Sequence, residues 1–217
     1  MGYDGYAVST PVATASTMKL VGGDPCLDFV NTVGGREQSR VRADKLASYS
    51  ELVGFAEHAG LVSANAARGL KRMGSARPRE AEAVLQRARA FREALYAALR
   101  ALMLGRRPAP VQLRTLNTEL AACRSRERLA LRRGRLLWGW PEATERLDSP
   151  LWPVARAAAA LLTSAELARL RQCGGDACGW LFLDRSRNRS RQWCTMQDCG
   201  NLSKVRRFRR RQRRSHP

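Results

Sequence analysis

The sequence predicts an α+β protein: a mainly helical N-terminal domain with a small β-hairpin, followed by a small treble-clef-like module held by four cysteines. Three observations lead to this prediction. Hydrophobic residues make up 44% of the 217 residues and aromatic residues only 6%, so alanine and leucine dominate the apolar set, which favours helices. Apolar residues recur every three or four positions before Gly105. Near the C-terminal end, the cysteines form two close pairs.

The chain is expected to divide into three parts. Residues 1–17 are small, polar and unpatterned, which predicts a flexible N-terminus, with order beginning near Met18. Residues 18–168 form the helical domain, and residues 169–217 form the four-cysteine module with a basic C-terminal helix. The helical domain opens with MKLVGGDPCLDFVNTV, in which the turn-forming GGDP precedes a short apolar run. This run is compatible with a short strand or with the start of a helix.

Two short helices are expected next, as a helical hairpin. Ser48 or Ser50 caps the first helix, which runs through His58 and stops at the glycine two residues later. Ser63 caps the second helix, which ends near Met73.

The strongest periodicity predicts a long helix that begins at Pro78 and ends before Gly105, because proline is tolerated in a first helical turn. Its repeating apolar residues are Val84, Ala88, Phe91, Leu95, Ala98 and Leu102. A further helix follows Pro110, with the same spacing up to Cys123.

A β-hairpin and one more helix complete the first domain. The sequence RLALRRGRLLWGW, residues 128–140, alternates loosely around Gly134 as a hairpin does. Ser149 and Pro150 then offer an N-cap and a first-turn proline for a helix through residues 157–160 that continues towards Leu170.

Four cysteines have the spacing of a metal site. Cys173 and Cys178 form one C-x(4)-C pair, fifteen residues follow, and Cys194 and Cys199 form a second pair. Zinc requires four ligands in a tetrahedron, and two close pairs supply two of its edges. Glycines 174, 175 and 179 allow the backbone to fold tightly around an ion. Because four thiolates leave no open coordination position, the single zinc ion is expected to be structural.

The quartet has two other interpretations: buried thiols or disulfides, and an iron–sulfur cluster. A chain without a signal-like N-terminus is expected in a reducing cytosol, which disfavours disulfides. The paired spacing suits zinc better than the common cluster spacings. Cys26 and Cys123 are isolated and flanked by apolar residues, so they are expected to pack in the core.

Basic residues concentrate beside the cysteines. The chain carries 39 Lys or Arg against 19 acids, and residues 171–217 hold 13 of the former against 3 of the latter. Between the cysteine pairs, Arg185, Arg187, Arg189 and Arg191 alternate, so in an extended chain they would share one face and follow phosphate oxygens. A solvated loop is the alternative interpretation.

The segment after Cys199 predicts a helix in which Val205 and Phe208 pack inward while basic residues cover the rest. Like charges three and four residues apart repel, so a polyanion would stabilise this helix. The candidate nucleic-acid contacts on it are Lys204, Arg206, Arg207, Arg209 and Arg210, with Arg211, Arg213 and Arg214 beyond them.

The quartet enclosing CGWLFLDRSRNRSRQWC, followed by CGN and a basic helix, closely resembles the CGNR zinc-finger family. The preceding VGGDPCLDFVNTV, with Arg36, Asp44 and Leu46, resembles the ABATE domain. This resemblance implies a bacterial, stress-linked transcription regulator whose finger binds DNA and whose N-terminal domain senses a small-molecule effector. The arginine that the family carries after CGN is Leu202 here, so its role is absent or transferred to Lys204 or Arg206.

A ligand site in the N-terminal domain is expected, if present, at Asp28, Asn31, Thr32 and Arg36, a polar set that follows an apolar run. Structural capping and turn formation are the stronger interpretation of these residues. The chain is not expected to be an enzyme, because it has only two histidines and shows no nucleophile, carboxylate pair or phosphate loop.

The expected function is therefore a zinc-dependent, DNA-binding transcriptional regulator in the bacterial cytoplasm, associated with the nucleoid. An RNA-binding or ribosome-associated protein is the alternative, since arginine-rich helices also recognise RNA. No membrane association is expected, because no apolar stretch is long enough to span a bilayer. A homodimer would supply the second half-site that one small finger usually needs.

Overall fold

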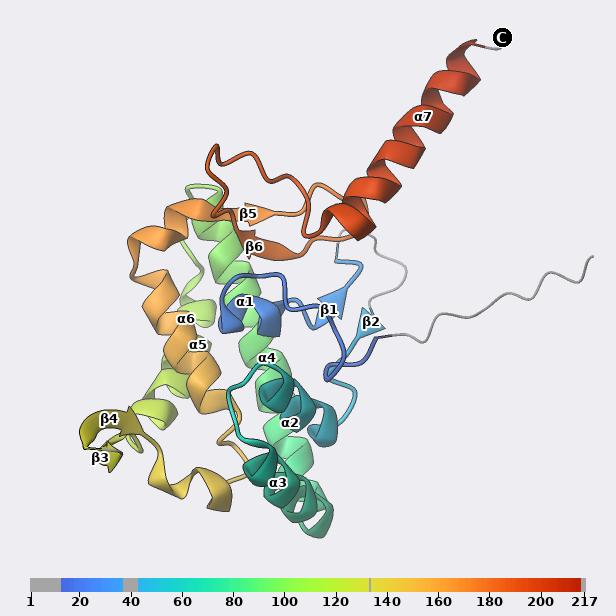
Figure 1. Ribbon diagram of the computed structural model, residues 1–217. Helices are drawn as coiled ribbons and strands as arrows, with labels where there is room; N and C mark the ends of the chain where they lie inside the picture. Colours follow the sequence, from blue (N-terminus) through green and yellow to red (C-terminus); the bar gives the residue numbers. More distant parts are fainter. Residues whose placement is uncertain (1–12, 37–42, 133, 216–217) are drawn as a thin grey trace, which may run out of the picture.

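The computed structural model describes residues 13–36, 43–132 and 134–215 and confirms the α+β class (Figure 1). The helices of the N-terminal part are α1 (Pro25–Val30), α2 (Tyr49–His58), α3 (Ala64–Ala76), α4 (Pro78–Met103), α5 (Pro110–Arg124), the short η1 (Pro141–Glu145), α6 (Leu151–Leu162) and the short η2 (Ala165–Arg169). Its strands are β1 (Val33–Gly34) with β2 (Ala43–Asp44), and β3 (Arg128–Arg132) with β4 (Arg135–Gly139). The C-terminal part contains β5 (Leu170–Gln172), β6 (Leu181–Leu183), the π-type turn η3 (Met196–Gly200) and α7 (Asn201–Ser215).

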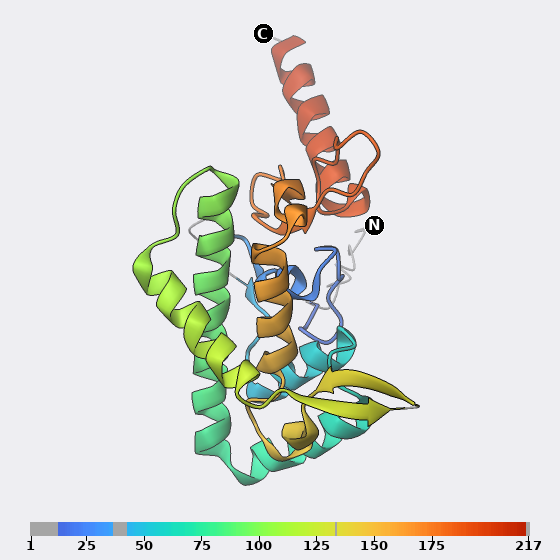
Figure 2. The ribbon, with the colours of Figure 1, turned by 90° about the vertical axis from the view of Figure 1, so that its left-hand side faces the viewer.

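Helix α4 is the centre of the bundle, with α5, α6 and α1 packed along it and the α2–α3 hairpin against its first half (Figures 1 and 2). The ring of Phe29 on α1 lies 5.7 Å from that of Phe55 and 5.8 Å from that of Phe91, centroid to centroid. These three rings join α1, α2 and α4 in one buried core. Among the described residues, no helix combines the length and apolar character that spanning a membrane requires.

The short apolar run after GGDP is helical, which settles the alternative between strand and helix. Asp24 caps α1 by accepting a hydrogen bond from the backbone N–H of Cys26 at 2.9 Å, and Pro25 occupies the first turn. Residues 26–30 are all buried. Because α1 is short and enclosed on every side, burial rather than helix propensity determines its conformation.

The α2–α3 hairpin begins where the sequence indicates but ends later. Ser48, not Ser50, caps α2 by accepting from the N–H of Glu51, and Ser63 caps α3 in the same way. The prediction that the second helix ends near Met73 is wrong by one turn, since α3 continues to Ala76. It stops there because the next residue precedes Pro78, and a residue before proline disfavours helical backbone.

Helix α6 is shorter than the sequence pattern indicates. It ends at Leu162 rather than continuing towards Leu170, because the Thr163 and Ser164 hydroxyls bond back to carbonyl oxygens of the last turn. The predicted N-cap at Ser149 is also wrong, since its hydroxyl donates to the carbonyl of Ala143 instead. The chain then forms η2 and enters β5.

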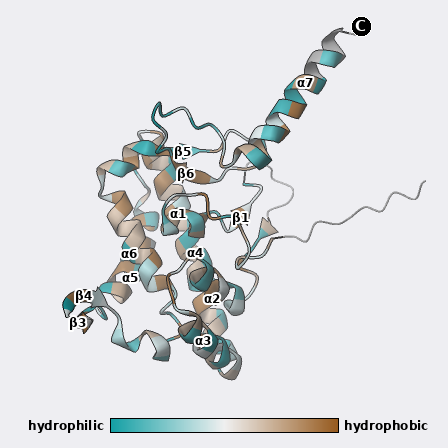
Figure 3. Ribbon diagram, in the orientation of Figure 1, coloured by the Kyte–Doolittle hydropathy of each residue, from teal (hydrophilic) through white to brown (hydrophobic). Residues whose placement is uncertain are grey.

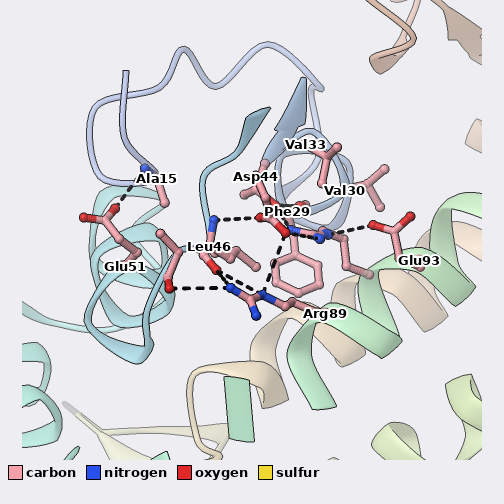
Figure 4. Close-up of polar contacts among 12 residues, drawn as sticks. Ala15, Phe29, Val30, Val33, Asp44, Leu46, Glu51, Arg89 and Glu93 are labelled. Atoms are coloured by element: carbon pink, nitrogen blue, oxygen red, sulfur yellow. Dashed lines mark hydrogen bonds and ion pairs between the residues drawn. The ribbon is translucent and has the colours of Figure 1, made fainter. Parts of the chain in front are cut away.

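Packing begins before Met18. Ala15 is fully buried, and its N–H donates to a carboxylate oxygen of Glu51 at 3.0 Å (Figure 4). Lys45 donates to the carbonyl of Ala13 at 3.0 Å. The part of the expected N-terminal lead-in that the structure describes, residues 13–17, is therefore fixed against α2, whereas residues 1–12 lie outside the described part of the chain.

Ion pairs hold the β1–β2 ribbon on α4. Buried Arg92 pairs with Asp44 at 2.7 Å. Arg89 donates to the carbonyl of Leu46 at 2.8 Å (Figure 4). Burial alone would raise the pKa of Asp44, but hydrogen bonds from Arg92 hold that pKa below its ordinary value. Arg36 pairs with Glu93 at 2.7 Å. Asp44 in β2 and Arg36, which follows β1, are thus both tied to α4.

The C-terminal module shares the core of the helical domain. Strands β5 and β6 pair antiparallel, with Leu170 opposite Leu183, and Leu181 lies on the same strand. All three leucines belong to the single large hydrophobic cluster that also contains α1, α4 and α6. The colouring in Figure 3 shows the contrast between this apolar interior and the hydrophilic helix α7.

Candidate metal centre and basic surface

Four thiol groups converge at the junction of the β5–β6 hairpin and α7. The Sγ atoms of Cys173, Cys178, Cys194 and Cys199 all lie within 4.8 Å of one another. The Sγ of Cys194 is 3.8 Å from that of Cys178 and 3.5 Å from that of Cys199. Zinc–thiolate bonds of about 2.3 Å in a tetrahedron place sulfurs about 3.8 Å apart, so the cluster fits one zinc ion.

The backbone around the cluster is shaped for this packing. A Cβ at Gly175 would stand 3.1 Å from the Sγ of Cys199, so a side chain there would crowd the ligands. A Cβ at Gly174 would stand 3.1 Å from the Trp193 ring, and one at Gly200 3.2 Å from another edge of the same ring. Trp193 therefore lies between the loop of the first cysteine pair and the start of α7, where it fixes their spacing.

The electrostatics of the cluster favour a thiolate. Hydrogen bonds from the thiols of Cys178 and Cys194 lower the pKa of Cys173, and the backbone N–H of Cys194 also donates to its Sγ at 3.2 Å. A zinc ion would complete this set with four thiolates and no open position, and it would act as a structural clip. The other two cysteines, Cys26 and Cys123, are fully buried in the core, as predicted.

Asn31 joins the cysteine module to the helical domain. Its side-chain amide donates to the carbonyl of Leu181 at 2.8 Å and its oxygen accepts from the N–H of Leu181 at 2.9 Å. Nearby, the N–H of Leu183 donates to the carbonyl of Gly22, and the Trp180 indole donates to the carbonyl of Val33. The segment around α1 thus forms hydrogen bonds with strand β6 and its neighbouring residues, which lie about 150 residues later in the chain.

The other residues of the candidate ligand set serve internal contacts as well. Burial raises the pKa of Asp28 to about 6, and its carboxylate accepts from the N–H of Gly22 at 2.8 Å. Thr32 donates to the carbonyl of Phe29, and the Arg36 guanidinium lies 4.0 Å from the centre of the Tyr96 ring. The four polar side chains thus have different partners within the fold.

The arginine loop, residues 185–191, is a compact turn and not the extended row that its alternation indicates. Buried Asp184 organises it by accepting hydrogen bonds from the N–H and hydroxyl of Ser186 and from the N–H of Arg191. The hydrogen bond from the Ser186 hydroxyl lowers the pKa of Asp184. Sequence reasoning missed this carboxylate, although an aspartate two residues before a serine is a known turn signal.

The four arginines of the loop have two different roles. Arg185 donates to Glu166 and to the carbonyl of Gly23, and Arg191 donates to three backbone carbonyls while its guanidinium stacks on Phe182. Among the side chains that the structure describes, those of Arg187 and Arg189 are exposed and have no hydrogen-bond or ion-pair partner. These two are the arginines of the loop that are available to an external anion.

Helix α7 projects from the body, and beyond its first turn it stands apart from the rest of the protein (Figures 1 and 2). The expectation that Val205 and Phe208 pack inward is therefore wrong: they are 45% and 60% exposed. Arg206 pairs with Asp176 of the first cysteine loop at 2.7 Å, whereas Leu202 is exposed in the first turn.

The remaining basic candidates on α7 form its exposed surface. Lys204, Arg207 and Arg209 are exposed. The side chain of Arg210, and those of the arginines that follow, lie outside the described part of the chain. The helix and the arginine loop project from the same end of the molecule (Figures 1 and 2).

A cavity of about 440 Å³ lies between the β1–β2 ribbon and the cysteine module. Gly34 and Gly35 line it from the ribbon, and Trp180, Leu202 and Ser203 line it from the module. The cavity therefore touches both parts of the chain beside the thiol cluster.

Two family models match adjacent parts of the chain. The ABATE model, whose description is "putative stress-induced transcription regulator", matches residues 23–165, and the CGNR zinc-finger model matches residues 169–212. Among curated proteins, none matches this chain. The first model covers more than half of the sequence, and the second contains all four clustered cysteines.

Proposed function

We propose that this chain, which belongs to the ABATE family of putative stress-induced transcription regulators and ends in a zinc-binding CGNR finger, is a zinc-dependent, DNA-binding transcriptional regulator. The observation that supports this most directly is the basic end of the molecule, where the free Arg187 and Arg189 and the arginine-rich α7 project together. A protein that neutralises several phosphates gains affinity in this way, and its binding weakens steeply with salt.

The zinc ion supplies rigidity to this surface and takes no part in contacts with DNA. By holding the two cysteine pairs together, it fixes the direction in which α7 leaves the module relative to the arginine loop. The protein acts by binding rather than by catalysis. It acts in the bacterial cytoplasm, at the nucleoid.

The test compares zinc-loaded protein with chelator-treated protein in binding to genomic promoter fragments and to random duplex of equal length. We expect zinc-dependent binding that decreases with salt and favours a subset of promoters by at least about a thousandfold. Equal affinity for random duplex would refute a sequence-specific regulator.

An RNA-binding protein is the second candidate, since α7 as an exposed arginine helix also suits RNA. Crosslinking in cells, followed by sequencing of both nucleic acids, separates the two. Enrichment of RNA over DNA would replace the first proposal by the second. Sedimentation with and without a target duplex tests whether two copies bind together, as a second half-site requires.

The cavity beside the thiol cluster supports an effector role. A small molecule bound between Gly34 and Trp180 would contact the ABATE part and the finger at once, and it would stabilise one relative placement of them. Small, largely apolar molecules that raise the melting temperature of the chain would identify the ligand class. Leu202→Trp, which fills the cavity, should abolish those shifts.

A further inference from the structure

A second depression on the finger is lined by a different set of residues from the cavity described above. It is a shallow groove of about 430 Å³ between β5 and the return of the arginine loop. Arg171, Gln172 and Gly174 line one side, and residues 189–193 line the other. A hydrogen bond of 2.9 Å from the N–H of Gly174 to the carbonyl of Gln192 joins the two sides, so the groove has a fixed width.

The charge of the groove is one-sided. Three arginines, 171, 189 and 191, line it, and none of its lining residues is acidic. The guanidinium of Arg191 donates hydrogen bonds to the carbonyls of Val21, Trp193 and Cys194. That of Arg171 donates to the carbonyls of Ala168 and Leu170. Neutral carbonyls orient these guanidinium groups. The buried carboxylate of Asp184, which interacts electrostatically with Arg171, offsets one of the three positive charges. The groove therefore keeps a net positive charge and attracts an anion.

The backbone of Arg189 provides an independent observation. It has a φ of 49°, and among the described residues it is the one non-glycine residue in the left-handed region. This conformation costs about 1–2 kcal/mol in a residue with a side chain. The loop maintains it through hydrogen bonds from the N–H of Arg189 to the carbonyl of Ser186 and from the N–H of Ser190 to the Ser186 hydroxyl.

Glycine would remove that cost, yet an arginine occupies the position and its guanidinium is free at the mouth of the groove. Strain that the surrounding structure enforces is typical of residues held in place for a ligand. The groove is also open and shallow, so it suits the sugar–phosphate backbone of a nucleic acid that runs across it better than a small anion that needs an enclosed site.

We propose that this groove binds a backbone phosphate of DNA, with Arg189 as the direct contact, Arg171 as a second cation and Arg191 as the internal support. The inference rests on the proposed DNA-binding function and assigns to it a contact that is separate from α7. It also brings in Arg171, which lies outside the alternating row.

The deciding variant is Arg189→Gly, because glycine accepts the left-handed backbone and the loop keeps its fold. We expect about a tenfold loss of affinity for duplex DNA, the size of one charge-assisted hydrogen bond. The slope of log affinity against log salt should fall by about 0.9, so the difference from the unmodified chain should shrink about 3.5-fold between 50 and 200 mM salt. Arg171→Gln should act in the same direction.

The matched control is Arg72→Ala, which removes one exposed charge from α3, far from the finger. It should leave both the affinity and the salt slope unchanged, and zinc content should remain the same in all variants. The groove proposal is overturned if Arg189→Gly and Arg171→Gln keep the original affinity and salt slope while the double variant Arg207→Ala/Arg209→Ala loses affinity. DNA binding itself would stand in that case. Failure of the unmodified chain to bind any duplex would overturn both.

Discussion

Replacing Asn31 by alanine tests whether the finger and the helical domain form one cooperative unit. In the native chain both polar atoms of the fully buried Asn31 side chain bond to the backbone of Leu181, at 2.8 and 2.9 Å. The substitution leaves the N–H and C=O of Leu181 without these partners in a site that excludes water. Each orphaned group costs about 1–3 kcal/mol, so the loss of both partners should lower the free energy of unfolding by about 2–6 kcal/mol.

The measurement is urea unfolding of the zinc-loaded protein, followed by far-ultraviolet circular dichroism. A loss of this size is a large fraction of the roughly 5–15 kcal/mol by which a domain is stable. We also expect the single transition to separate into two, because the finger loses its main polar link to α1. Asn117→Ala removes an exposed asparagine from α5 and should change the free energy of unfolding by less than about 0.5 kcal/mol.

A loss below about 1 kcal/mol with one sharp transition would refute this reasoning. It would mean that water replaces the amide or that the apolar contacts of Leu181 and Leu183 alone hold the two parts together.

Three further predictions concern packing, pH and metal. Gly74→Ala should destabilise the chain by about 1–3 kcal/mol, because the new Cβ would lie 2.5 Å from the Tyr49 ring. Gly69→Ala on the same helix should stabilise the chain, because its new Cβ meets nothing within 4 Å. Equal melting temperatures for the two variants would contradict this prediction. Burial raises the pKa of Asp28 from 3.8 to about 6. Between these two pH values the folded state keeps the Asp28 carboxyl protonated, whereas the unfolded state releases the proton. The free energy of unfolding therefore falls by up to about 3 kcal/mol as the pH rises through this range. Asp28→Asn should therefore be more stable than the unmodified chain above about pH 6, and the advantage should shrink towards pH 4; a pH-independent difference in urea unfolding would exclude the mechanism. Cys199→Ser should weaken zinc binding more than about a hundredfold in chelator competition while the circular dichroism of the helical domain persists, and unchanged metal retention would remove this cysteine from the ligand set.

The sequence was sufficient for the features that depend on local chemistry. The serine caps of α2 and α3, the hairpin around Gly134 and the cysteine pairs all follow from short-range preferences, and the structure confirms them. The cysteine spacing alone led to the metal centre, because few other arrangements bring four thiols together at low loop cost.

What the sequence could not supply was the set of partners from distant segments. The alternation of arginines 185 to 191 indicated an extended row, but Asp184 folds the loop. The carbonyls of Gly23 and Val21, in the segment before α1, accept hydrogen bonds from the guanidinium groups of Arg185 and Arg191. The apolar residues of α7 were expected inside because periodicity cannot show that a helix leaves the body. Asn31 looked like either a cap or a ligand, and its bond to Leu181 is invisible without the fold.

The shared core of the finger and the helical domain has a consequence for how DNA would be engaged. A finger on a free linker can rotate to meet a site in any direction, but here Leu170, Leu181 and Leu183 fasten the hairpin to the helices. If the finger binds DNA as proposed, the axis of the duplex would thereby be set relative to the whole body. In a two-fold dimer, the packing of the two helical domains would then determine the distance between the half-sites. Lengthening the segment that connects the helical domain to the finger would not change that distance.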